Sequence, residues 1–265
     1  MSLYFTGAEI KVNGSGLIAE SVSISTQNAV TQLAALGYRT LSATTPSNNV
    51  TSTINITYLV EPINEPNLAV VEYIKTGFNQ FNWEPTLIGF AGITGSGYLT
   101  NYGLKITPND QVRASVSYQC FHPLTGGLVS TPLNRTVEFS GLADSWLSFL
   151  ISPITEFRFP VYDIDYSFRA AWEPVYKMGQ KTPLQVQFQN GEENVSLVWD
   201  NFKHIEYSGT SFTGEINQMT GISLLLHQRD ENININLSGT ILTNSQINGT
   251  VDDIIKTTLQ GTRFF

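Results

Sequence analysis

The sequence is poor in charged residues, which make up 14% of its 265 positions. A typical soluble domain has about 25%. Its 14 basic residues are outnumbered by 22 acidic ones, and no stretch is rich in Lys or Arg. Because tight binding to a phosphate backbone needs clustered cations, this composition argues against a protein that grips nucleic acid.

Cysteine occurs once, at Cys120, so no disulfide can form within the chain. Cys120 lies in an alternating stretch, and we expect it to be a small buried apolar residue instead of a nucleophile. The lack of a disulfide framework fits folding in a reducing cytosol. No apolar run is long enough to cross a bilayer, and the first residues predict no signal peptide.

Signatures of catalysis and of cofactor binding are also lacking. The three histidines, His122, His204 and His227, are scattered and have no Cys, Asp or Glu at the spacing of metal ligands. The sequence has no Walker loop, no nucleophile elbow and no HExxH motif. We therefore predict that the chain is not an enzyme and has no catalytic, metal or cofactor site.

What the sequence does contain is alternation of apolar and polar residues. Residues 104–120 can be laid over residues 225–241 without a gap, which brings Val116 onto Leu237. Such alternation predicts a strand with one buried face and one wet face. The predicted wet faces consist of Arg113, Ser115, Ser117 and Gln119 in the first stretch and Asn232, Asn234 and Asn236 in the second.

A second pair of segments repeats in the same order. Residues 22–24 match residues 164–166, and after a glycine-containing turn residues 54–58 match residues 195–199. Two ordered matches, each with a turn and a strand, indicate a duplicated β-module.

We therefore predict a mainly β protein of two tandem antiparallel β-sandwich or barrel modules, over residues 1–130 and 131–265. One or two short helices are predicted within it. Residues 67–76 have an apolar stripe between Pro66 and Gly77, and residues 250–260 have a stripe after a possible capping box.

These elements together resemble the tail tube proteins of long-tailed bacteriophages. The resemblance is carried by the hairpin at Asn13-Gly14, the turns at Leu36-Gly37 and Met178-Gly179, the helix, and the strand pair over residues 98–121, YLTNYGLKITPNDQVRASVSYQCF. The duplicated form is similar to tube proteins in which two such modules share a chain. The family is defined by its fold, so no functional residue is carried over from it.

The resemblance implies a structural virion protein that assembles into a ring or tail tube through which DNA passes. Its expected partners are other copies of itself and other tail or baseplate proteins, with no membrane. It implies a location in the virion tail and, during assembly, in the host cytoplasm. Six modules to a ring imply a trimer with pseudo-six-fold symmetry. The seven polar residues named above are then expected to face the lumen, and DNA passes them without specific binding.

A different class of function remains open from the sequence. A carbohydrate- or receptor-binding β-sandwich, such as a virion adhesin or a lectin-like protein, would use exposed aromatic side chains such as Trp83, Trp172 and Trp199. Core packing is the competing interpretation of these tryptophans, because most of them coincide with the apolar side of a predicted strand.

Overall fold

The protein is described here from a computed structural model. The described residues exclude 1, 9, 34–42, 62–64, 78, 81–82, 108–109, 127–131, 139–145, 152–154, 160, 179, 201–217, 220–222, 229–230, 238 and 249–255. For several strands beside these gaps only the backbone is described.

The fold is mainly antiparallel β, as the alternation predicts. The helix of the described part is α1 (Pro66–Gly77), which confirms the prediction for residues 67–76. The predicted helix over 250–260 is wrong where the chain is described, because β19 (Lys256–Phe264) is a strand. Its β-branched Thr257 and Thr258 are better strand formers, and pairing on both sides outweighs the helical spacing.

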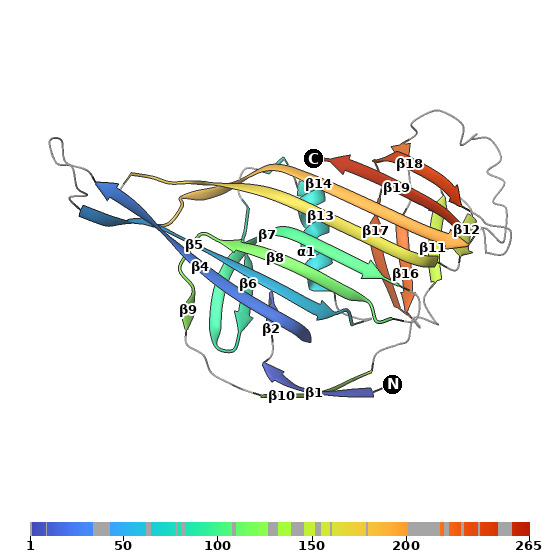
Figure 1. Ribbon diagram of the computed structural model, residues 1–265, viewed down its shortest axis with the longest axis horizontal. Helices are drawn as coiled ribbons and strands as arrows, with labels where there is room; N and C mark the ends of the chain where they lie inside the picture. Colours follow the sequence, from blue (N-terminus) through green and yellow to red (C-terminus); the bar gives the residue numbers. More distant parts are fainter. Residues whose placement is uncertain are drawn as a thin grey trace.

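One large sheet organises the chain (Figure 1). Its eight long strands follow the order β4 (Ala19–Leu33), β5 (Ala43–Leu59), β8 (Arg113–Cys120), β7 (Ile93–Ile106), β13 (Val161–Val175), β14 (Gln185–Asp200), β19 and β18 (Thr240–Asn248). The short β15 (Gln218–Met219) pairs with the start of β18. The sheet runs without a break across the predicted module boundary, because β7 pairs with β13.

Two sets of four strands in this sheet have the same order of pairing. The first set is β4–β5–β8–β7, and the second is β13–β14–β19–β18. Register agrees as well: Val22 pairs with Ile56 in the first set, and Ile164 pairs with Leu197 in the second. The second sequence match therefore joins strands in equivalent positions.

The first sequence match, of residues 104–120 with residues 225–241, does not join strands in equivalent positions. Strand β8 lies in the large sheet, whereas its supposed counterpart β17 (Glu231–Asn236) lies in a separate four-stranded sheet. That sheet has the order β12 (Thr155–Phe159), β11 (Trp146–Ile151), β16 (Ser223–Gln228) and β17. Ile235 of β17 is buried, as the alternation predicts, but β17 belongs to a different sheet.

Shorter strands complete the described part. A hairpin joins β2 (Ile10–Val12) to β3 (Ser15–Leu17) through Asn13 and Gly14, whose φ angles of 49° and 87° suit a tight turn. Strand β6 (Thr86–Phe90) pairs with β2 and β7, and β9 (Thr125–Gly126) pairs with β7. Strand β1 (Ser2–Ala8) pairs with the distant β10 (Pro132–Glu138) instead of joining the hairpin.

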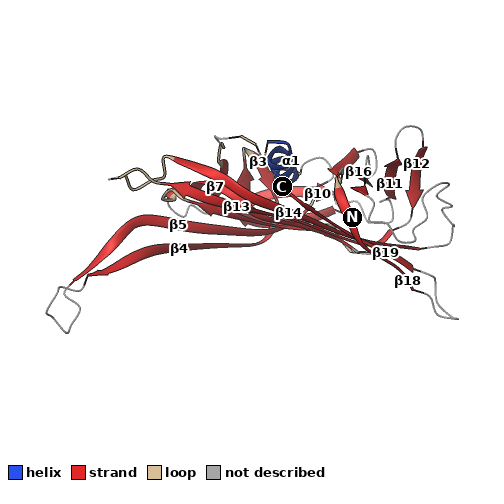
Figure 2. Cartoon of the chain, turned by 90° about the horizontal axis from the view of Figure 1, so that it is seen from above, coloured by secondary structure: helices blue, strands red, loops and turns tan. Residues whose placement is uncertain are grey.

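The core lies against one face of the large sheet. Helix α1 crosses that face, with the four-stranded sheet beside it (Figure 2). Large buried side chains of the sheet point to this side, among them Tyr58, Tyr102, Tyr118, Tyr166 and Phe168. Among the described residues, no helix has the length and apolar character that crossing a bilayer would require.

Candidate functional site

The opposite face of the large sheet is polar across its strands. Residues directly paired in antiparallel strands put their side chains on the same face, so register lines trace the surface. One such line consists of Ser21, Thr57, Ser115, Gly103, Ser167, Asn194 and Thr262. Every member is uncharged, and none is buried. We call the surface built on this line and its neighbours the polar face.

Side-chain hydrogen bonds connect neighbouring strands on the polar face. Ser117 Oγ donates to Asn55 Oδ1 at 2.7 Å, and Asn55 Nδ2 donates to Ser23 Oγ at 3.2 Å. In the second half Thr262 Oγ1 donates to Asn194 Oδ1 at 2.8 Å. These hydrogen bonds pair hydroxyl and amide groups of neighbouring strands with one another.

The cations of the polar face lie near acids, although two of them are also neighbours. Lys105 pairs in register with Asp165 on one side and with Arg113 on the other, and Arg169 pairs with Glu192. Arg113 forms ion pairs with Asp110 (2.6 Å) and Glu20 (3.3 Å). The backbone amide of Gln111 and the Arg113 guanidinium hold the pKa of Asp110 below its usual value. The face therefore lacks a positive stripe within the described residues.

The structure divides the seven residues that were predicted to face a lumen. Arg113, Ser115, Ser117 and Gln119 come together on the polar face, at least partly exposed. The others, Asn232, Asn234 and Asn236, are carried by β17 in the four-stranded sheet, so they do not extend this face. The directions of their side chains fall outside the described part.

Sequence reasoning missed the partners of those four residues. Asn55, Ser167, Asn194 and Thr262 continue the polar face on other strands. The signal was present for Asn55 and Ser167, because each lies between two buried apolar residues, as Ser167 does between Tyr166 and Phe168. What the sequence does not state is which strands are neighbours.

Beneath the other face, buried polar groups fix α1 at its start. Tyr58 donates a hydrogen bond to Glu65, and Asn67 links the hydroxyls of Tyr58 and Tyr118 at 2.7 and 2.6 Å. Burial raises the pKa of Glu65 to about 7, although its hydrogen bonds act in the opposite direction. Burial also raises the pKa of Tyr58.

The two sides of the large sheet end in strands with free edges. Within the described residues β4 pairs only with β5, and β18 beyond Ile241 pairs only with β19. Open edges present unpaired N–H and C=O groups, which makes them templates for pairing with another chain. Figure 1 shows these edges on opposite sides of the sheet.

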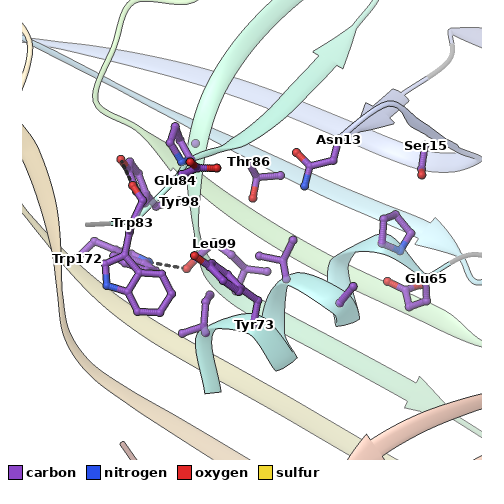
Figure 3. A pocket seen from close by; sticks show the side chains of 16 residues that line it. Asn13, Ser15, Glu65, Tyr73, Trp83, Glu84, Thr86, Tyr98, Leu99 and Trp172 are labelled. Carbon is purple, nitrogen blue, oxygen red and sulfur yellow. Dashed lines mark hydrogen bonds between the residues drawn. The ribbon is translucent and has the colours of Figure 1, made fainter. Parts of the chain in front are cut away.

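A pocket of about 700 Å³ opens between α1 and the β6–β7 region. Figure 3 shows Trp83, Tyr98 and Trp172 at one end and Glu65 at the other. Trp83 is only 6% exposed, and its ring meets Trp172 nearly at a right angle. Trp83 therefore packs in the core, as the competing interpretation predicts, whereas Trp172 is partly exposed at the pocket. Trp199 has no described side-chain environment.

Comparisons with known proteins give little. No family model matches the sequence, and no curated protein matches it. Among solved structures, the protein is similar to the crystal structure of the SPP1 Dit protein, described as a hub adsorption apparatus of phages that infect Gram-positive bacteria. The match covers 97% of this chain and 99% of that one, at 10% identity and a TM-score of 0.26. A TM-score of 0.26 is too low to establish a common fold.

Proposed function

We propose that the chain is a structural subunit of a bacteriophage tail, present in the virion and assembled in the host cytoplasm. In this proposal it acts without catalysis and without a cofactor. Its large sheet forms one part of a closed ring, and the polar face of that sheet lines a channel through which DNA passes. The observation that carries the proposal is the polar face itself, which continues across strands of both halves.

Closure of the ring follows from the free edges. The β4 edge of one copy would pair with the β18 edge of the next, a heterologous contact that generates a ring when the rotation closes. Closure would remove both edges, which an isolated sheet leaves open to aggregation. With six modules to a ring, as the resemblance to tube proteins implies, two four-stranded sets per chain would need three copies, giving three-fold symmetry with six similar lobes.

The size of such a barrel is compatible with a channel. Barrels of about 16–18 strands already enclose an aqueous channel. Three copies of an eight-stranded sheet exceed that number. The chemistry of the wall also supports passage: duplex DNA carries about one charge per 1.7 Å, and clustered cations would hold it in place. The channel wall instead has hydrogen-bonded hydroxyls and amides, and its cations lie beside acids. Such a wall lets DNA slide.

Negative-stain imaging of the purified chain, together with its mass by light scattering, tests the proposal. We expect rings with three-fold symmetry and six lobes, and a mass three times the 29.3 kDa of the chain. Six lobes each made by a whole chain would contradict the trimer. A monomer that does not close at any concentration would contradict the ring.

A further inference from the structure

The pocket beside α1 has an acidic and aromatic lining. Its charged lining residues are Glu65 and the exposed Glu84, and none of its lining residues is Lys or Arg. The aromatic side chains are Tyr73, Trp83, Tyr98 and Trp172. Its volume lies within the range of about 300–1,000 Å³ typical of ligand sites. Such a lining suits a cationic group on an apolar stem, because rings attract cations and carboxylates pair with them.

The aromatic walls have room for an apolar contact at the rim. Tyr73 is 43% exposed, and its ring stands at 78° to that of Trp83. The indole N–H of Trp83 is buried without a hydrogen-bond acceptor among the described residues. An apolar side chain of a bound segment can therefore pack on the exposed ring of Tyr73 at the rim.

A segment with the complementary chemistry occurs in this same chain. The turn between β13 and β14, residues 175–184, exposes Met178 fully and Leu184 to 64%. Lys177 and Lys181 are exposed beside them. We call this segment the basic tip. It contains no acidic residue.

Two backbone hydrogen bonds close the described part of the basic tip. Gln180 N–H donates to the Lys177 carbonyl at 3.0 Å, and Leu184 N–H donates to the Val175 carbonyl at 2.8 Å. A preformed segment loses less conformational entropy on binding than a flexible one.

The tip is not placed to enter the pocket of its own chain. Strands β13 and β14 extend toward one end of the sheet, whereas α1 crosses near its middle (Figure 1). Contact with a pocket therefore requires a second molecule. Such a contact joins two different surfaces, so it is heterologous and can extend a stack of rings.

We propose that the pocket beside α1 receives the basic tip of a second copy of this chain. Lys177 or Lys181 pairs with Glu84 at the mouth, and Met178 packs on the rim formed by Tyr73. This contact is separate from the edge pairing that closes a ring. It holds whether or not rings form.

A peptide of residues 173–187 added to the full chain tests the contact directly. We expect saturable binding, detected by a change in tryptophan fluorescence. The same peptide with Lys177→Glu and Lys181→Glu should bind about tenfold or more weakly. In the full chain, Glu84→Lys should weaken binding of the native peptide and strengthen binding of the charge-reversed peptide. Glu20→Lys, which makes the same charge change on the polar face, should do neither.

Self-association of the full chain gives the second readout. By sedimentation velocity, the Lys177→Glu, Lys181→Glu variant should lose assemblies larger than a single ring or monomer, and adding Glu84→Lys to it should restore them. Equal binding of native and charge-reversed peptides would overturn the proposal. So would saturable binding of a neutral oligosaccharide such as cellohexaose with none of the peptide. Rings that form normally while the Lys177→Glu, Lys181→Glu variant makes the same larger assemblies as the unmodified chain would reject this contact and leave the channel proposal standing.

Discussion

Lys75 on helix α1 and Glu193 on strand β14 form an ion pair, with 2.6 Å between Nζ and Oε1 and side-chain exposures of 3% and 0%. Tyr166 donates a second hydrogen bond to the same Glu193 oxygen at 2.8 Å. The pair joins the helix of the first half to a strand of the second. The two halves are therefore held together under the sheet as well as by the pairing of β7 with β13.

Replacing Lys75 by Met should destabilise the chain strongly. The change leaves Glu193 buried without its cation, a situation that costs about 3–5 kcal/mol. The double variant Lys75→Met, Glu193→Leu should recover most of the loss, because no buried charge remains. Urea unfolding measures both. Glu20→Ala removes a partly exposed ion pair with Arg113 and should cost no more than about 1 kcal/mol. A similar small cost for Lys75→Met would contradict this account.

Stability should fall as the pH rises through neutrality because of Glu65. Its folded pKa of about 7 lies above the usual value of 4.5, so the folded state favours the protonated carboxyl. The resulting stabilisation is complete below the unfolded pKa and is lost as the pH rises through about 7. The difference is at most about 3 kcal/mol.

Glu65→Gln isolates this contribution, because its amide does not titrate. The free energy of unfolding, compared between pH 5 and pH 8, should change less in Glu65→Gln than in the unmodified chain. Equal changes in the two proteins would show that Glu65 does not titrate in this range.

Of the two sequence matches that predicted a repeat, only one joins strands in equivalent positions of the sheet. The two matches imply different offsets: Val116 to Leu237 is 121 residues, whereas Ile24 to Tyr166 is 142. Both cannot describe one duplication. The large sheet supports the longer offset, since Ile24 pairs with Ile54 as Tyr166 pairs with Val195. Alternation alone could not separate them, because any strand with one buried face shows it.

The polar face was predictable in part for the same reason. Alternation fixed which side of β8 is wet, and Ala114, Val116 and Tyr118 are buried as expected. It could not place β7 next to β13, a long-range pairing with no local signal. The pocket was also beyond sequence reasoning, because Trp83 and Trp172 meet only through the folded sheet.

The polar face should turn into a DNA-binding surface when cations are added to it. The unmodified chain should show no tight, salt-sensitive binding of duplex DNA. Ser115→Lys with Ser167→Lys places two cations on either side of Gly103. Binding measured by anisotropy should then appear at low salt and weaken as salt rises, because each neutralised phosphate steepens the log–log slope by about 0.9.

The control for that variant puts two lysines elsewhere. Thr76→Lys with Asn79→Lys changes exposed residues at the end of α1, on the other side of the sheet (Figure 2). This variant should bind DNA less tightly than the polar-face variant once rings have formed, because the duplex then meets only the channel wall. Tight binding by the unmodified chain at physiological salt would count against a wall over which DNA slides.

Proline in the edge strand β4 should separate ring closure from folding. Successive N–H groups of a strand point to opposite edges, and proline removes one of them. Of the neighbouring variants Ser25→Pro and Thr26→Pro, both at exposed positions, one therefore loses an N–H directed at β5 and should lower the free energy of unfolding. The other loses an N–H directed at the open edge, so it should unfold within about 1 kcal/mol of the unmodified chain but form no rings, because edge strands tolerate proline only where nothing pairs. Ser25→Ala keeps every N–H and should form rings normally. Unfolding curves identify the edge-directed variant, and imaging of that variant decides the matter. Normal rings from it would show that β4 does not pair with a neighbouring copy.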